Sequence, residues 1–293
     1  MTEIPIVAVV PAFHPDARVA HLVAALLSQV DRVVVVADGP DALPTPRRVE
    51  VETAGATVLV HDENRGIAAA LNSGIRAAPD AGAVLTVDQD STVPDGFVDA
   101  LRAAWTRATA VGLKVGLVAP ERVAGIPSQI AARRRGVALG RDPVQSGLLV
   151  TAEALSTVGE FDERLFIDGV DADYALRCLD SGFVVAVAEG LDLGHRLGDP
   201  HTVQIAGRRL ELTRSKPFRY YYLARNRRVL VRRHVRRHPR WAAAQALGLV
   251  RHLAVTLTLA PDRQARALET WHGWRDVGRG VTGRRPEGGN PPS

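Results

Sequence analysis

Apolar runs and helical repeats alternate through the first 90 residues. The runs are short and rich in β-branched residues, and with the polar residues that end them they occupy residues 4–13, 32–39, 57–66 and 83–90; the first is nearly continuous. Such runs are typical of strands that are covered on both faces of a sheet. Between them, residues 17–30 repeat Val and Leu at helical spacing, and residues 66–78 form an alanine-rich helical pattern. The alternation predicts βαβ units and an α/β fold with a mainly parallel central sheet flanked by helices.

The second half of the chain is less regular. Strands are expected at 115–120 and 184–195, a strand followed by a helix within 143–159, and an acidic stretch that turns helical within 161–183. Beyond residue 215 the pattern is helical and basic. The apolar segment 241–260 has the length of a membrane span, but Arg251 and His252 lie at its centre. A cation at mid-bilayer is costly, so we expect a surface helix.

The length of 293 residues fits one large domain with an appendage. We expect a larger α/β domain over 1–215, a helical basic extension over 216–282 and a disordered tail over 283–293. The single cysteine excludes an internal disulfide framework and indicates a reducing compartment. The amino-terminal "MTEIPIVAVVPAF" is typical of a first strand and not of a signal peptide, so a cytoplasmic location is expected.

Positive charge is concentrated in one stretch. Residues 214–240 contain ten Arg, one Lys and no acid, and since the whole chain carries +5, the rest carries −6. Nucleic-acid binding would use Arg on phosphates and Tyr for stacking. Membrane-surface binding would use Arg on anionic headgroups, with Trp241 as an interfacial anchor. The third interpretation is a solvated face, or arginines paired with the acidic remainder.

Polar residues gather where the expected strands end. In open α/β sheets, ligands bind beyond the carboxyl ends of the strands, and here those ends carry Pro11-Ala12, Asp38, Asn64-Arg65-Gly66 and Asp88-Gln89-Asp90. The dinucleotide fingerprint and the P-loop are both absent from the sequence.

Two of these residues suggest a cation. Asp88 and Asp90 lie on the same side of an extended segment, and Mg²⁺ or Mn²⁺ prefers carboxylates together with substrate phosphates. From the residues alone, the alternative that Asp88 caps a strand and Asp90 belongs to a turn remains open.

The order of several segments resembles family 2 glycosyltransferases with the GT-A fold, especially bacterial rhamnosyltransferases that use dTDP-rhamnose. The resemblance spans residues 5–230 with a weaker match at 271–283, and it rests on "VVPAF", "VVVVADG", "DENRGIAAALNSGI", "VLTVDQDS", "FIDGVDADYALR", "LGHRLGD" and "FRYYYLARN". Each segment is unspecific alone, whereas the set in this order is specific.

The resemblance implies roles for the matched positions. It makes Asp171 the catalytic base, with Val170 at the position where the family often has Glu. It implies nucleotide contacts for Pro11, Ala12, Asp38, Arg65, Asp88 and Gln89, metal binding for Asp90 and His195, and acceptor-side or supporting roles for Ser146, Gly147, Asp168, Asp173 and Arg177. Thr-Tyr-Asn often ends the family's first strand, and Pro-Ala-Phe stands there in this chain.

The implied activity is a metal-dependent transfer with inversion. A sugar hydroxyl is a poor nucleophile, so a carboxylate must take its proton, and one base opposite the leaving group gives a single displacement. The implied donor is dTDP-L-rhamnose. The implied acceptor is a glycan or a polyprenyl-diphosphate-linked glycan of cell-envelope polysaccharide synthesis, reached at the anionic inner face of the membrane.

Three alternatives stay open at this point. One is a galactofuranosyltransferase that uses UDP-galactofuranose. Another is a nucleic-acid or anionic-lipid binding protein whose aspartates are structural. A nucleotidyltransferase would need a Gly-rich basic loop after the first strand, and "PAFHPDARV" does not provide one.

Overall fold

The computed structural model describes residues 4–128, 130–195, 199–205, 208–214, 216–259 and 262–285. The chain divides into two compact units. The sheet unit comprises Met1–Glu163 and Val170–Arg196, and the helical unit comprises Arg164–Gly169 and Leu197–Ser293. The sequence had placed the boundary near residue 215, so the structure differs in two respects: the division falls at Arg196, and a short segment from the middle of the chain belongs with the helical unit.

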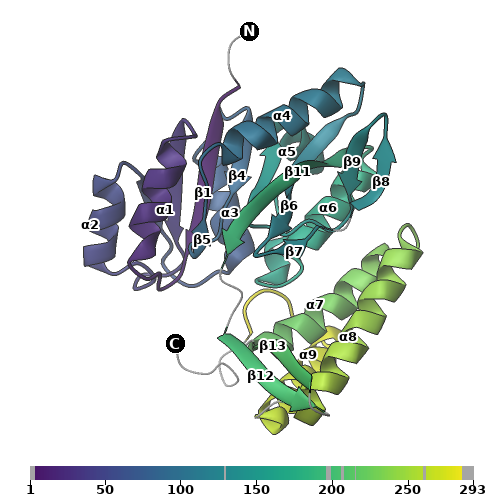
Figure 1. The fold of residues 1–293 in the computed structure, drawn as a ribbon. Coiled ribbons are helices and arrows are strands. Elements are labelled where there is room, and N and C mark those ends of the chain that lie inside the picture. Colours follow the sequence, from purple (N-terminus) through teal and green to yellow (C-terminus); the bar gives the residue numbers. More distant parts are fainter. Residues whose placement is uncertain are drawn as a thin grey trace. The chain divides into compact units, whose positions relative to one another are not determined.

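One mixed sheet organises the sheet unit (Figure 1). Its strands run in the order β3 (Thr57–Val60), β2 (Arg32–Ala37), β1 (Ile6–Ala12), β4 (Ala83–Thr86), β10 (Leu148–Thr151), β6 (Val115–Val123), β11 (Val184–His195), β9 (Val137–Gly140) and β8 (Ile130–Arg134). The first four are parallel, β10 is antiparallel to both of its neighbours, and β6 and β11 are parallel to each other. The short strands β5 (Ser91–Thr92) and β7 (Ile126–Pro127) pair with β11 and β6.

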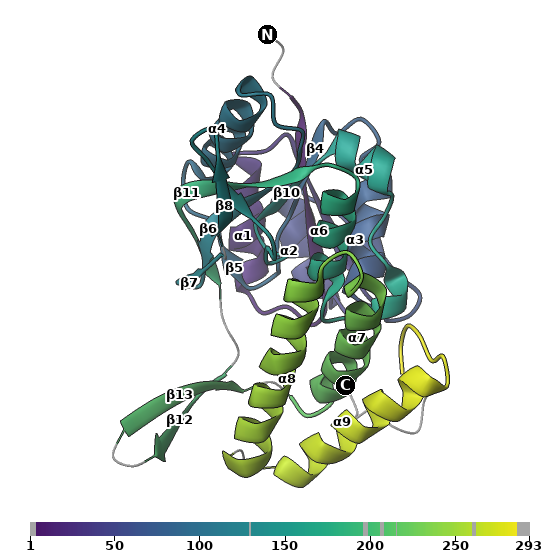
Figure 2. The same cartoon turned by 90° about the vertical axis from the view of Figure 1, so that its right-hand side faces the viewer.

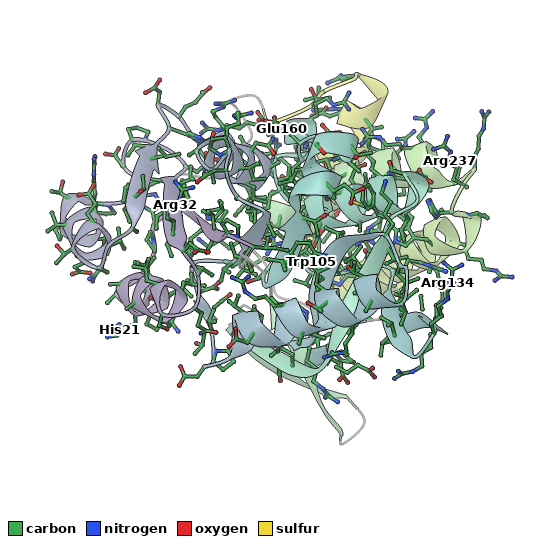
Figure 3. The ribbon with its side chains drawn as sticks, turned by 90° about the horizontal axis from the view of Figure 1, so that it is seen from above. His21, Arg32, Trp105, Arg134, Glu160 and Arg237 are labelled. Atoms are coloured by element: carbon green, nitrogen blue, oxygen red, sulfur yellow. The ribbon has the colours of Figure 1, made fainter. Side chains whose placement is uncertain are left out.

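Helices cover both faces of this sheet. Figure 3, seen from above, labels His21 of α1 (Arg18–Leu27) and Trp105 of α4 (Phe97–Ala110) on one side, and Glu160, just after α5 (Ala152–Val158), on the other. Buried residues of α1 and α4 pack with Ile6, Ala8 and Val10 of β1. The alternate β1 positions face α3 (Ile67–Arg76), where a Cβ on Gly74 would lie 2.3 Å from Val9 Cγ1. A glycine is therefore required for this close approach of helix and strand.

The strands and helices predicted in the first 90 residues are present. The structure adds α2 (Thr45–Thr53) between β2 and β3 and the long helix α4, neither of which was among the expected elements. In the second half, α5 follows β10 and α6 (Val170–Asp180) follows the acidic stretch, as expected. A 3₁₀ turn, η1 (Glu163–Leu165), lies between α5 and α6.

The helical unit contains a hairpin of β12 (Asp199–Ile205) and β13 (Arg208–Arg214), followed by α7 (Arg219–His234), α8 (Pro239–Leu259) and α9 (Arg263–Gly278) (Figure 2). Helix α7 contacts both α8 and α9. Within the described residues no helix is both long enough and apolar enough to cross a membrane. Part of the expected tail is ordered, since Gly283 donates to the Arg164 carbonyl (2.6 Å) and Arg285 is buried beside Glu269. Residues 286–293 lie outside the described range.

Candidate active site

The segment after β4 is anchored on two sides. The backbone N–H of Asp88 donates to Ser146 Oγ at 2.9 Å. The amide of Gln89 exchanges two hydrogen bonds with the backbone of Phe13, accepting from its N–H at 2.6 Å and donating to its carbonyl at 3.1 Å. Asp88, Gln89 and Asp90 are all half-buried. The structure thus holds this segment between the end of β1 and a turn just before β10.

That turn, residues 145–147, is fixed from below by β4. Thr86 Oγ1 donates to the Gln145 carbonyl at 2.5 Å, and the N–H of Gly147 donates to the Thr86 carbonyl at 2.7 Å. Gly147 has φ of +80°, and a Cβ there would lie 3.0 Å from Leu193 and 3.1 Å from Phe97, so the position requires glycine. Ser146 is fully buried, and its Oγ also lies 2.7 Å from Ser91 Oγ.

Asp171 joins the same turn from the opposite side. It lies in the first turn of α6, where one carboxylate oxygen accepts from the N–H of Gln145 at 3.2 Å and the other from the N–H of Ala172 at 2.8 Å. The structure therefore brings Asp88 and Asp171 to one three-residue turn, although 83 positions separate them in the sequence. Gln145 is buried, and its side-chain nitrogen has no hydrogen-bond partner within the described part of the chain.

Asp173 and Arg177 form a structural pair behind Asp171. Asp173 is fully buried and accepts from Arg177 Nε at 2.8 Å. The guanidinium also donates to the carbonyls of Val158 (3.1 Å) and Glu160 (2.9 Å) and lies over the Tyr174 ring. A buried ion pair of this kind fixes an arrangement more than it adds stability. The pair holds α6 against the loop that follows α5, and the supporting role in catalysis expected for both residues stays a prediction.

Asp38 has three hydrogen-bond donors around its carboxylate. Oδ1 lies 2.9 Å from His61 Nδ1 and accepts from the N–H of Arg65 at 2.9 Å, while Oδ2 accepts from the N–H of Gly66 at 2.7 Å. Only 5% of Asp38 is exposed. His61, which the sequence analysis did not single out, also contacts Ser73 Oγ at 2.9 Å. The visible task of Asp38 is to hold the turn that begins α3, and its predicted nucleoside contact stays a prediction.

The other predicted nucleotide contacts surround Asp38. Pro11 and Ala12 end β1, and the Ala12 carbonyl accepts from the N–H of Asp38 at 2.9 Å. The side chain of Arg65 is partly exposed and pairs with Glu163 at 3.0 Å. These residues therefore form one group at the carboxyl ends of β1 and β2, as expected for an open α/β sheet.

We expect Asp38→Asn to destabilise the fold by about 1–3 kcal/mol, because the amide puts a donor against N–H groups that need an acceptor. Thermal unfolding measures the change. Asp41→Asn is the matched control, since it makes the same substitution at an exposed position three residues away. Equal melting temperatures for Asp38→Asn and the wild type would show that this carboxylate does not hold the turn.

The two predicted metal ligands lie beside a pair of strands, since Asp90 directly precedes β5 and His195 ends β11. The β5–β11 pairing places the backbone of His195 opposite Ser91, the residue after Asp90. The side chain of His195 lies outside what the structure describes. Within the described residues no group of three Asp, Glu, His or Cys side chains could hold a metal ion.

A hollow of about 580 Å³ lies beside the same strand pair. It is lined by Thr92, Pro94, Ala124, Gly125, Asp192 and Gly194. None of the predicted site residues lines it, and it contains a single carboxylate, so it carries no catalytic assignment here.

Asp168 belongs to the helical unit and not with the other predicted residues. It has φ of +64° and forms an ion pair with Arg219 of α7. The segment around it, residues 164–169, is bound by two adjacent α7 side chains. Asn226 Nδ2 donates to the carbonyls of Leu165 (2.8 Å), Ile167 (2.6 Å) and Asp168 (2.8 Å).

Arg225 completes this binding. Its guanidinium donates to the carbonyls of Arg164 (3.2 Å), Leu165 (2.9 Å) and Gly283 (2.6 Å). Arg225 and Asn226 are 1% and 2% exposed. We call residues 164–169 with these two side chains the loop clamp. The loop ends at Gly169, and the predicted base Asp171 follows two residues later in the sequence. "FRYYYLARN" contains both residues, but the sequence did not show what they bind.

Comparison with known proteins identifies the class of enzyme. Residues 7–129 match the family model described as "Glycosyl transferase family 2". The chain is 28% identical over 242 residues to the dTDP-rhamnosyl transferase RfbF of Shigella flexneri, covering 78% of this chain and 80% of that protein. The chain is a glycosyltransferase, and its residues 7–129 are similar to family 2. The resemblance to rhamnosyltransferases of this family, predicted from its motifs, is confirmed.

Solved structures confirm the fold of this glycosyltransferase. The structure of S. aureus TarS 1-349 in complex with UDP-GlcNAc superposes with a TM-score of 0.62 at 14% identity, covering 94% of this chain and 81% of that one. The structure of GalNAc-T7 with UDP, GalNAc and Mn²⁺ superposes with a TM-score of 0.54 at 11% identity, covering 70% of this chain but only 45% of that one. The predicted GT-A fold is therefore present.

Proposed function

We propose that this glycosyltransferase moves L-rhamnose from dTDP-L-rhamnose to an acceptor hydroxyl with inversion, and that Asp171 is the general base. The observation that carries the proposal is the turn 145–147, which binds the Asp171 carboxylate through Gln145 N–H and the donor-site residue Asp88 through Ser146 Oγ. A base and a diphosphate-binding segment held by one turn have the proximity that a single displacement needs.

Asp171 is suited to the role by its surroundings. Two backbone N–H groups hold the carboxylate in one orientation, and it lies in the first turn of α6, where a negative charge is favoured. The carboxylate takes the proton of the acceptor hydroxyl as the oxygen bonds to the anomeric carbon, and the diphosphate leaves from the opposite face. The unpartnered amide of Gln145 would donate to an oxygen-rich substrate at this place.

A divalent metal fits the donor set. Mg²⁺ keeps several waters and is usually bound through one or two carboxylates plus substrate phosphates, so Asp90 and His195 with the donor diphosphate form a chemically suitable set. Mn²⁺ and UDP are both present in the GalNAc-T7 structure. When bound, the metal would offset the charge that develops on the departing diphosphate.

The donor and the acceptor follow from different observations. The donor is proposed from the RfbF relative, which is a dTDP-rhamnosyl transferase. The acceptor is proposed to be a glycan or a polyprenyl-diphosphate-linked glycan of cell-envelope polysaccharide synthesis, because the cationic helical unit suits a substrate held at an anionic membrane surface.

A donor panel tests the proposal. Release of nucleoside diphosphate from dTDP-rhamnose, UDP-galactofuranose and UDP-GlcNAc is measured with and without EDTA. We expect dTDP-rhamnose to be preferred and EDTA to abolish release. We also expect dTDP to raise the melting temperature of the wild type only when Mn²⁺ or Mg²⁺ is present, and Asp90→Ala to lose this metal requirement. Preference for a UDP-sugar would contradict the assignment of dTDP-rhamnose as the donor, and turnover that persists in EDTA would contradict the assignment of a metal.

A further inference from the structure

Helix α9 has its polar side chains inside and its large apolar side chains outside. The buried positions are Arg266, Thr270, Gly273 and Asp276. The exposed ones include Leu268 (53% exposed), Trp271 (62%) and Trp274 (44%). An ordinary surface helix shows the opposite arrangement, with its apolar stripe facing the core. Folding of the helical unit therefore does not explain why two of the four tryptophans of the chain face solvent.

The inward face of α9 is fixed by specific contacts with α7. A Cβ on Gly273 would lie 2.3 Å from the Tyr221 carbonyl oxygen, so only glycine permits the close approach of the two helices. Tyr221 donates its hydroxyl to Asp276 at 3.1 Å, and the Arg266 guanidinium lies 4.8 Å from the centre of the Tyr220 ring. The helix cannot rotate without losing these contacts. The packing of α9 on α7 therefore fixes the tryptophans on the outward face.

The surroundings of these tryptophans are strongly cationic. Residues 216–285 contain 17 Arg and Lys and 3 Asp and Glu, a net charge of +14. Among these acids, Glu269 pairs with Arg285, and Asp276 pairs with Arg275 and accepts from Tyr221. On α9 itself, Arg263 and Arg275 are exposed, and Arg275 lies one helical turn from Trp271.

We propose that the tryptophan face, defined as Leu268, Trp271, Trp274 and Arg275, docks on the surface of an anionic lipid bilayer. Tryptophan is amphipathic and favours the headgroup level of a membrane, and each Arg near an anionic surface adds attraction. The docking rests on the proposed function in one respect, that an acceptor on a lipid diphosphate carrier would be presented at this surface.

The face differs from the one that the sequence suggested. Trp241 was the expected interfacial anchor, but it is 5% exposed and packs edge-on against His234. The prediction that Trp241 anchors the protein at a membrane is therefore wrong. The arginines at 232, 233, 236 and 237 are exposed, and Figure 3 labels Arg237 just beyond the end of α7. They add to the electrostatic attraction and supply no apolar contact.

Charge and shape favour a bilayer over other partners. Two copies meeting through this face would bring +14 against +14, which opposes self-association. A nucleic acid would use the arginines and could stack on the rings, but it offers no apolar layer for Leu268.

Vesicle binding of the full-length protein tests the proposal. We expect sedimentation with phosphatidylglycerol vesicles but not with phosphatidylcholine vesicles, and a blue shift of tryptophan emission on binding. The double variant Trp271→Gln, Trp274→Gln should bind at least about tenfold more weakly and lose the blue shift, with an unchanged melting temperature. The matched control is Val49→Gln, which removes an exposed apolar side chain (54% exposed) from α2 and should bind as the wild type does.

Three results would overturn the proposal. The double variant could bind vesicles as well as the wild type does, it could lose binding to RNA while its vesicle binding is unchanged, or the wild type could be a dimer that the two substitutions dissociate. Nucleoside diphosphate release with a soluble acceptor separates this test from the proposed function. Vesicle binding without transfer activity would leave the docking surface standing and remove the function. Transfer activity without vesicle binding would support the proposed function and contradict the docking surface.

Discussion

Asp171→Asn is expected to lower kcat by about 100- to 10,000-fold, the contribution typical of a positioned general base. The amide keeps the size of the side chain, and its oxygen can still accept one backbone N–H, so the fold should survive. Donor binding should also survive, because Asp88 and its bond to Ser146 are untouched. Transfer rates, together with the melting-temperature shift caused by dTDP and Mn²⁺, separate chemistry from binding.

Asp180→Asn is the matched control for this variant. It makes the same substitution on the same helix, at the exposed end of α6 away from the turn 145–147. The control should transfer sugar at the wild-type rate. Turnover in Asp171→Asn as fast as in the control would remove Asp171 as the base.

Asn226→Asp is expected to give the largest loss of stability. The carboxylate would place negative charge against three carbonyl oxygens that now accept from Asn226 Nδ2, in a site that is 2% exposed. The Leu165 carbonyl keeps its hydrogen bond from Arg225, whereas the carbonyls of Ile167 and Asp168 lose their donor. Leaving a buried carbonyl unpaired costs about 1–3 kcal/mol, so we expect a destabilisation of roughly 2 kcal/mol or more, measured by chemical denaturation.

The loop clamp also predicts an effect on catalysis. Asn226→Ser keeps one donor and should fold. The loop leads directly into the helix of Asp171. At temperatures well below the melting temperature of this variant, where it is folded, we therefore expect a lower kcat than that of the wild type and a KM for the donor near the wild-type value. For the stability of Asn226→Asp, the control is Gln264→Glu, which makes the same amide-to-carboxylate change at an exposed position of the helical unit. A wild-type kcat in folded Asn226→Ser would limit the clamp to stability.

Local patterns were sufficient to predict the strands of the first 90 residues and the residues at their ends, but not β7, β8, β9, β12 or β13. The apolar runs of β1, β2 and β4 are fully covered, and the residues that follow them lie together as the rule for parallel sheets requires. Helix α4 could have been found as well. Phe97, Val98, Leu101, Ala104 and Ala108 repeat at helical spacing after Gly96, and all five are buried.

Contacts between distant segments could not be predicted in the same way. Nothing near Asn226 in the sequence indicates that it binds carbonyls about 60 positions earlier, and nothing near Gln145 indicates that its N–H meets Asp171. The tryptophans illustrate the same limit. Trp241 and Trp271 are equally apolar in the sequence, and only the packing against α7 decides which one is buried.

The most direct test of the central claim is the anomeric configuration of the transferred sugar. If Asp171 acts as a single base opposite the leaving diphosphate, nuclear magnetic resonance of the purified product should show the configuration inverted relative to the donor. A product with retained configuration would contradict the account, because a single displacement at one carboxylate cannot yield it.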